Sequence, residues 1–446
     1  MNPLRHMFSW VFLAMISCCW GKDFLAQTQT LPPTLTTELV IELALSSPVF
    51  HNEATARLNL ASGKLESARR WWMPSTTLGA TRFVHSGNAL NANGEMFTDV
   101  DSRSAELGFA LSFNADASRG LSGVKSERLS YQATIQEVKS DRDAFVLSCI
   151  NTFISAIAAK RDYDFHKLAL EELLSFEIQY QALADLGLRP QSDALSARTE
   201  RLQLESLLLT LNANIALATA ELRGALGMSM SPDIDSVWPI PDERHSLDLI
   251  EQFGSDVFTN FFGDKNLPAR QALIYRVDQA KANMRGVLEE VWAPELRFNP
   301  MYSSFGTEFL STSMAPTNDW LTSLVFSFPI ENLLPGGKRK QTAALVDYYE
   351  ARLSEWDLRH LAYVEGLVER IQLISEALES SEQAVSSADL SLSDVVLRMT
   401  HGIVDPVELL SVQRARLNAH SRAISLKEQL LKLEFELISK TNPKWN

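Results

Sequence analysis

The run Gly336-Gly337-Lys338-Arg339 is the first group to weigh, because it resembles part of a phosphate-binding loop. That motif needs Ser or Thr after the lysine and an earlier glycine, where this chain has Arg339 and Asn332. The eight histidines contain no pair at metal-ligand spacing, and no Gly-x-Ser-x-Gly or dinucleotide fingerprint occurs. We therefore expect no enzyme, no cofactor and no metal site, and interpret the basic run as a strand-to-helix turn beside a membrane surface.

Two carboxylates, Asp193 and Glu408, occupy matching positions, since each follows a glycine at the same spacing. Each falls in the first turn of a predicted helix, where an acid can cap backbone N–H groups and complement the helix dipole. The pair Asp405-Pro406 before Glu408 has the pattern of a helix N-cap followed by proline at the first helical position. If these turns line a narrow passage, the same acids would attract cations. The sequence leaves capping and pore-lining roles open.

The N-terminus has the pattern of a secretory signal, and we expect residues 1–26 to form the signal-peptide region. A basic start precedes an apolar run at 7–20 that is too short to span a bilayer. Cleavage after Cys19-Trp20-Gly21 fits an ordinary signal peptidase, whereas Met15-Ile16-Ser17-Cys18 resembles a lipobox that would leave Cys18 lipid-modified. Both routes stay open, and both remove or modify Cys18 and Cys19. Cys149 then remains without a disulfide partner, as a small buried hydrophobe.

Composition excludes several classes of protein. The net charge of -14 argues against a nucleic-acid partner, because phosphate binding needs clustered Lys and Arg. With 46% apolar and 22% charged residues, the chain is neither disordered nor a bundle of membrane helices. No stretch after Trp20 approaches the unbroken apolar length that a membrane helix needs, so a helical membrane anchor is not expected. Entry into a membrane would then require a closed β-barrel.

The mature chain is an internal repeat. Three motifs recur in the same order and at one common offset: Ser112-Phe113 as Ser327-Phe328, Gly187 as Gly402, and Glu221-Leu222 as Glu436-Leu437. Trp72-Met73-Pro74 recurs as Trp292-Ala293-Pro294 at a slightly larger offset. We therefore predict two copies of one unit, at residues 37–227 and 268–440. A connector at 228–267 joins them and is expected to fold against the outside of the body.

Each unit is predicted to contain a helix, a strand pair, a very long helix and a second helix. First helices are expected at 37–70 and 268–291, ending before a proline. Residues 118–186 and 339–400 lack proline and repeat apolar residues every three or four positions, so each predicts a helix of roughly 90–105 Å. Second helices are expected at 191–224 and 407–440, and the short breaks between them predict two antiparallel helical hairpins.

The predicted strands alternate apolar and polar residues, as in Leu107, Phe109, Leu111 and Phe113, or Leu324, Phe326 and Phe328. This period of two, kept along a whole strand, suits a barrel with one lipid face and one polar lumen face. A half-buried hairpin of a soluble sheet has the same period. The Leu and Phe residues on one face and the polar loops at 87–101 and 306–318 favour the barrel.

Taken together, these motifs resemble the TolC-like outer-membrane efflux protein family over residues 37–440. The motifs are the two Trp-x-Pro steps, Phe326 through Ile330, Pro335 through Arg339, Gly187 through Ala194, Ala220 through Gly227, and Gly402 through Leu410. The resemblance implies a mainly α, mixed α and β fold in which four strands per protomer join a trimeric twelve-stranded transmembrane barrel. It also implies a coiled-coil tunnel whose tips dock with a periplasmic adaptor (a membrane fusion protein) and an inner-membrane pump.

By this resemblance, the chain is an outer-membrane exit duct of an efflux or type I secretion system in a Gram-negative bacterium. It lies in outer-membrane lipid with its helical body in the periplasm. The adaptor-docking tip would be Gly187-Leu188 and Gly402-Ile403, and the pore entrance Asp193 and Glu408. At a further position where the family has an acid, this chain has Ser411, so the acidic ring is thinner. The family's basic residue near the turn is also absent, since Val404 occupies its position. The alternative is a soluble periplasmic coiled-coil scaffold or adaptor.

Overall fold

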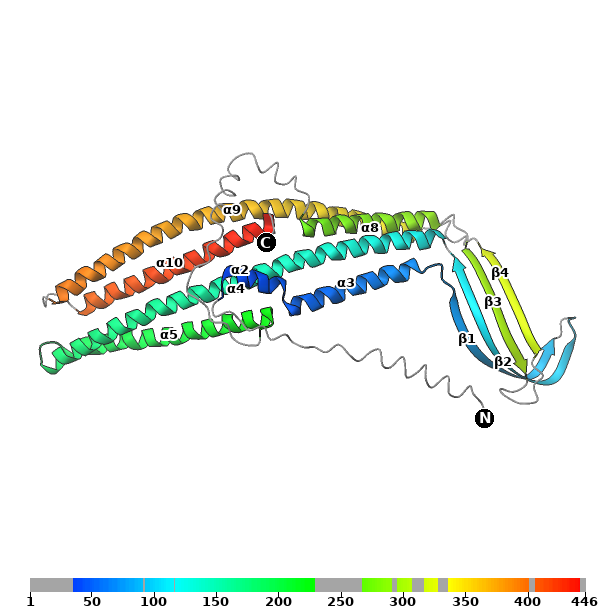
Figure 1. The fold of residues 1–446 in the computed structure, drawn as a ribbon, viewed down its shortest axis with the longest axis horizontal. Helices are drawn as coiled ribbons and strands as arrows, with labels where there is room; N and C mark the ends of the chain where they lie inside the picture. The colour runs from blue at the N-terminus through cyan, green and yellow to red at the C-terminus, as the bar shows by residue number, and fades with distance from the viewer. Residues whose placement is uncertain are drawn as a thin grey trace.

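The computed structural model describes residues 35–90, 93–115, 117–228, 267–290, 295–306, 317–327, 336–400 and 406–441. Cys18, the turn Gly402-Ile403 and nearly all of the predicted connector lie outside these residues. The molecule is elongated, with a sheet at one end and two helical tips at the other (Figure 1).

The elements follow the predicted order of helix, strand pair, long helix and helix, twice over. The first set is α2 (Thr37–Leu45), α3 (Pro48–Arg69), β1 (Ser75–Leu90), β2 (Met96–Ala115), α4 (Ala117–Asp185) and α5 (Gln191–Leu226). The second set is α8 (Pro268–Glu290), β3 (Glu295–Gly306), β4 (Thr317–Ser327), α9 (Gly336–Thr400) and α10 (Pro406–Thr441). Helices α5 and α10 both have 36 residues, and they begin at positions related by the offset that takes Gly187 to Gly402.

The prediction of one continuous first helix at 37–70 is wrong, because the chain breaks between α2 and α3. Pro48 begins α3, and a proline disfavours helical geometry at the residue before it. The hydroxyl of Ser47 donates to the carbonyl of Ala225 at 2.8 Å, which fixes the break against the end of α5. Gly227, at φ +68°, ends α5 there, and a Cβ on it would meet Pro48 Cγ at 3.1 Å.

The strands form one antiparallel sheet in the order β1-β2-β3-β4. Its register places Leu78, Phe109, Tyr302 and Trp320 in one row on the same face. A second row on this face contains Phe113, Phe298 and Leu324. The opposite face has mainly small and polar residues, including Gly108, Ala110, Ser112, Asn299 and Ser323. The predicted alternation is therefore present in the sheet, with one apolar face and one mostly small or polar face.

The long helices pack side by side in the order α9, α10, α4, α5, and nearer the sheet in the order α9, α8, α4, α3 (Figure 1). The main core lies where Ile150, Phe153 and Ile157 of α4 meet Leu222 of α5 and Leu431 of α10. Cys149 is buried in this core, as predicted, and burial raises the pKa of its thiol to about 11.

One helix of the described chain, α4, contains a stretch long and apolar enough to cross a membrane, although this stretch is not an unbroken apolar run. Half of that stretch is buried inside the molecule. The core residues of α4 account for its apolar composition, because a central helix packed on several sides passes the same test.

Candidate functional site: the hairpin tips and the seam between the hairpins

The first hairpin tip ends in a glycine turn of the predicted kind. Gly187 has φ +66°, a left-handed conformation that glycine adopts without steric cost. The N–H of Leu188 donates to the carbonyl of Leu183 at 2.9 Å, and that of Gly187 to Ala184 at 2.9 Å, the two bonds of a Schellman cap. Leu188 and the preceding Leu186 are exposed at the end of the turn. The tip therefore presents apolar side chains on a backbone fixed by hydrogen bonds.

Asp193 lies in the first turn of α5, where the sequence placed it. Its backbone N–H donates to the carbonyl of Pro190 at 3.1 Å, and its carboxylate accepts from the hydroxyl of Ser192 at 3.3 Å. The side chain is partly exposed. This arrangement is compatible with both capping and pore-lining roles.

Glu408 lies in the first turn of α10 and has a basic partner that the sequence analysis missed. Arg398, near the end of α9, donates to its carboxylate at 2.7 Å and also to Asp394 at 3.0 Å. The hydrogen bond to Glu408 raises the pKa of the Arg398 guanidinium. Asp193 and Glu408 thus lie on different hairpins, whose tips lie at the same end of the molecule (Figure 1). Their described polar contacts stay within their own hairpins.

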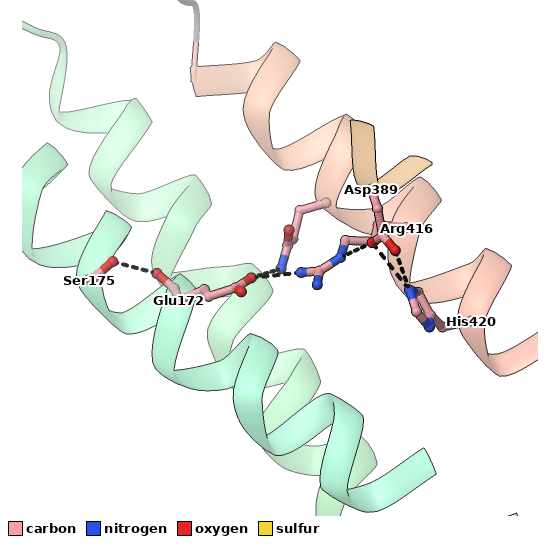
Figure 2. A network of polar contacts seen from close by, with 6 residues as sticks. Glu172, Ser175, Asp389, Arg416 and His420 are labelled. Atoms are coloured by element: carbon pink, nitrogen blue, oxygen red, sulfur yellow. Dashed lines mark hydrogen bonds and ion pairs between the residues drawn. The ribbon is translucent and has the colours of Figure 1, made fainter. Parts of the chain in front are cut away.

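A polar cluster further along the hairpins joins α4 to α10 (Figure 2). Glu172 of α4 accepts from the amide of Gln413 and from the guanidinium of Arg416, each at 3.0 Å. Arg416 also donates to Asp389 of α9 at 2.6 Å, so this one side chain connects three helices. We call this α4–α10 contact the intrachain seam.

His420 extends the cluster along α10. Its ring stacks on Phe165 of α4, with centroids 3.9 Å apart. Its Nε2 lies 3.2 Å from a carboxylate oxygen of Asp389 (Figure 2). The guanidinium of Arg416 lies 5.3 Å from the centre of the Phe165 ring, within cation–π range. Burial alone would raise the pKa of Asp389, but hydrogen bonds from Arg416 and His420 outweigh it and lower that pKa.

Asp162 makes the next contact across the seam. Its carboxylate accepts from the hydroxyl of Ser421 at 2.8 Å and lies 3.2 Å from Nδ1 of His166, a buried side chain on the same helix. Burial lowers the pKa of His166, but the contacts with the Asp162 carboxylate and carbonyl outweigh it, and the pKa is raised. A charged and hydrogen-bonded seam therefore continues along both helices.

The intrachain seam widens into a groove of about 880 Å³ that residues of α4, α5, α8, α9 and α10 line. Lys432 donates to the hydroxyl of Ser155 and to the carboxylate of Glu428, both at 2.6 Å, and Ser155 donates to Glu428 at 2.9 Å. These polar groups bridge α4 and α10 at the groove.

Sequence reasoning missed the whole seam. Glu172, Asp389 and Arg416 each look like an exposed charge on a long helix, and single helices of this kind carry many such charges. The helical period assigns a face to a side chain but does not say which distant helix covers that face. No motif connects the three residues.

No family model matches the sequence, and no curated protein matches it. Among solved structures, 22 chains match. The CmeC outer-membrane channel of Campylobacter jejuni aligns with TM-score 0.74 at 12% identity, covering 94% of this chain and 90% of that one. The outer-membrane protein VceC of Vibrio cholerae aligns with TM-score 0.71 at 15% identity, covering 91% and 95%. The MtrE outer-membrane channel of Neisseria gonorrhoeae, in its open state, aligns with TM-score 0.68 at 14% identity, covering 95% of both.

These matches run over nearly the full length of both chains, so the whole architecture is shared. The described part of the chain is mainly α, with its strands in a four-stranded antiparallel sheet. More specifically, it has the TolC-like fold of outer-membrane channels, as the sequence motifs predicted.

Proposed function

We propose that this protein is an outer-membrane exit duct, a passive conduit that works as a homotrimer. The observation that carries the proposal is the sheet: one exposed apolar face, one mostly small or polar face, and two edge strands, β1 and β4. An apolar face of this kind suits lipid, but unpaired strand edges do not, because their backbone groups would lack partners. Three copies supply about twelve strands, enough to close a barrel.

The helical body would continue the duct through the periplasm. Helix α4 has 69 residues and so extends about 100 Å from the sheet to the tips. The exposed Leu186 and Leu188 at the first tip form an apolar surface for a periplasmic adaptor, which would couple the duct to an inner-membrane pump. Asp193 and Glu408, present in every copy, would place acids around the tunnel entrance.

Two lysine substitutions on adjacent residues of β4 test the proposal. Leu324 lies on the apolar face and Ser323 on the opposite face. Lysine in place of a lipid-facing residue costs about 2–4 kcal/mol per strand position near the bilayer midplane, whereas a lumen-facing lysine is tolerated. We expect Leu324→Lys to be lost from the detergent-extracted outer-membrane fraction and Ser323→Lys to remain in it.

A soluble periplasmic scaffold gives the opposite result. Its wild-type chain would wash off membranes in high salt without detergent, and the two lysine variants would fractionate alike. Either finding would contradict the proposed membrane duct and favour the soluble scaffold.

A further inference from the structure

The sheet is uneven at its outer end, which points away from the helices that join it at the start of β1 and the end of β2. Strands β1 and β2 stay paired as far as Leu90 and Met96. The described part of β3 ends at Gly306, opposite Ala105 of β2. The hairpin of β1 and β2 therefore extends past β3, at the end of the molecule away from the helical tips (Figure 1).

The height of the apolar face shows where lipid would end on this sheet. A membrane barrel has an apolar band about 25 Å tall, and strands tilted by about 40° cross it in about ten residues. Near the helices, the apolar face begins with Leu296 and Phe326, which pair with each other and are exposed. Gly306 follows Leu296 by ten residues, and its row contains Ala105 and Arg82. The outer boundary of the band therefore falls at the row of Arg82.

An aromatic pair on the same face supports this position. Tyr302 and Trp320 are cross-strand neighbours, both exposed, with ring centroids 6.1 Å apart. Aromatic side chains of membrane barrels gather at the edges of the apolar band, beside the headgroups. The pair lies roughly 10 Å below the row of Arg82, and a headgroup layer is about 5–8 Å thick. Both features place Arg82 at the level of the outer headgroups.

Two arginines occupy neighbouring rows at this level. Arg82 lies four residues beyond Leu78 on the apolar face of β1, and its side chain is exposed. Arg103 of β2 pairs with Val84, so the register places it on the same face, one row further out. Diagonal neighbours of this kind in an antiparallel pair are about 7–8 Å apart. Two cationic residues are thus close enough to share one anionic group.

The positions around Arg82 are small and uncharged. Its row continues with Ala105 and Gly306, which have no bulky side chain to cover it. Among the described residues, Arg82 has no hydrogen bond or ion pair with another side chain. The acid Glu106 belongs to the opposite face of the sheet, and Asp101 lies two rows further out. The row of Arg82 therefore offers positive charge without a carboxylate beside it.

We infer that Arg82 and Arg103 bind the phosphate of a lipid headgroup in the outer leaflet. The guanidinium group presents a planar fork of N–H donors that matches phosphate oxygens. A lipid fits better than a free phosphate ion, because its acyl chains would lie on the exposed apolar row of Leu78 and Phe109 just below. The inference rests on the proposed function, since it needs this face of the sheet to be in a membrane.

Two forms of lipid A that differ by one phosphate test the inference. The purified full chain in detergent is mixed with diphosphoryl or monophosphoryl lipid A, and native mass spectrometry counts the lipid molecules retained per copy. We expect the wild type to retain several-fold more of the diphosphoryl form. The double variant Arg82→Gln with Arg103→Gln should bind that form roughly thirtyfold more weakly, because each basic residue at an anionic surface contributes about a factor of five.

Arg297→Gln is the matched control. Arg297 is on the same sheet, but it pairs with Val325 on the opposite face, so this variant should retain lipid A as the wild type does. Inorganic phosphate at millimolar concentration is the second control. It should not displace diphosphoryl lipid A, because it cannot contact the apolar row. Displacement by inorganic phosphate would make this a site for the free ion and would overturn the lipid site.

Two other results would also overturn the lipid site. One is equal retention of the two lipid A forms by the wild type, a comparison that holds even if the double variant fails to fold. The other is equal retention of diphosphoryl lipid A by the double variant and the control. Extraction of the wild type from membranes is measured beside them. A chain that needs detergent but fails these comparisons keeps the duct and loses the lipid site, whereas a chain that washes off in high salt loses both.

Discussion

Replacing Arg416 by methionine should loosen the intrachain seam while keeping the aliphatic length of the side chain. Arg416 is 20% exposed, and its acid partners Glu172 and Asp389 are 41% and 42% exposed. Fully buried charged hydrogen bonds contribute about 1.5–3 kcal/mol each, but solvent screening at this exposure reduces each to about 0.5–1 kcal/mol. The cation–π contact with Phe165 adds about 0.5–1 kcal/mol. The expected loss is therefore about 2 kcal/mol per chain.

The assay is thermal unfolding of the purified protein, monitored by far-ultraviolet circular dichroism at one fixed scan rate. We expect Arg416→Met to lower the melting temperature by a few degrees. Arg359→Met is the matched control, because Arg359 is 80% exposed and its ion pair among the described residues is with Glu355 of its own helix. That variant should melt like the wild type.

A double-mutant cycle with Glu172→Gln assigns the effect to the α4–α10 contact. The two substitutions should be non-additive by about 0.5–1 kcal/mol, because both remove the same ion pair. Equal shifts for Arg416→Met and Arg359→Met, or strict additivity with Glu172→Gln, would refute the role of this cluster in holding the hairpins together.

Three further results are expected. Gly187→Val places a β-branched residue at φ +66°, so adaptor binding in a pull-down should fall while trimer content in detergent is kept. Glu408→Gln removes the acid that Arg398 contacts; single-channel recordings should show weaker cation selectivity, and unchanged selectivity with a lower melting temperature would make Glu408 a cap only. The raised pKa of His166 means that its charged form stabilises the fold below the unfolded pKa, near 6.5, and that this stability is lost as pH rises through the folded value. The fall in melting temperature from about pH 6 to about pH 8 should therefore be smaller in Asp162→Asn than in the wild type.

The repeat made most of the fold predictable. Once Gly187 and Gly402 are aligned, the long helices, their breaks and the second helices follow from turn residues and apolar periodicity, which are local properties of the chain. Alternation in the strands likewise determined which residues share a face, and the register of the sheet puts Leu78, Phe109 and Leu324 on the apolar face as a period of two requires.

The break before Pro48 carried a local signal that was overlooked. Ser47 followed by proline is a helix-start pattern, but the apolar residues on both sides continue well enough to suggest a single helix. The reason for the break is distant in sequence, because Ser47 and Pro48 contact the end of α5 at Ala225 and Gly227.

The candidate site was only partly predictable. Asp193, Glu408 and the first glycine turn lie where sequence spacing placed them, but the partner of Glu408 is Arg398, which precedes the turn, whereas the family resemblance pointed to position 404. The seam cluster joins residues of different repeats that are far apart in the sequence. Its members are recognised only when the packing order of the helices is known.

Conductance tests most directly whether the protein forms an open path through a membrane. Purified trimers would be added to a planar lipid bilayer, with protein-free detergent buffer as the control. We predict discrete conductance steps from wild-type trimers and none from the control. Wild-type trimers that bind the bilayer but leave its conductance unchanged would contradict the proposed duct.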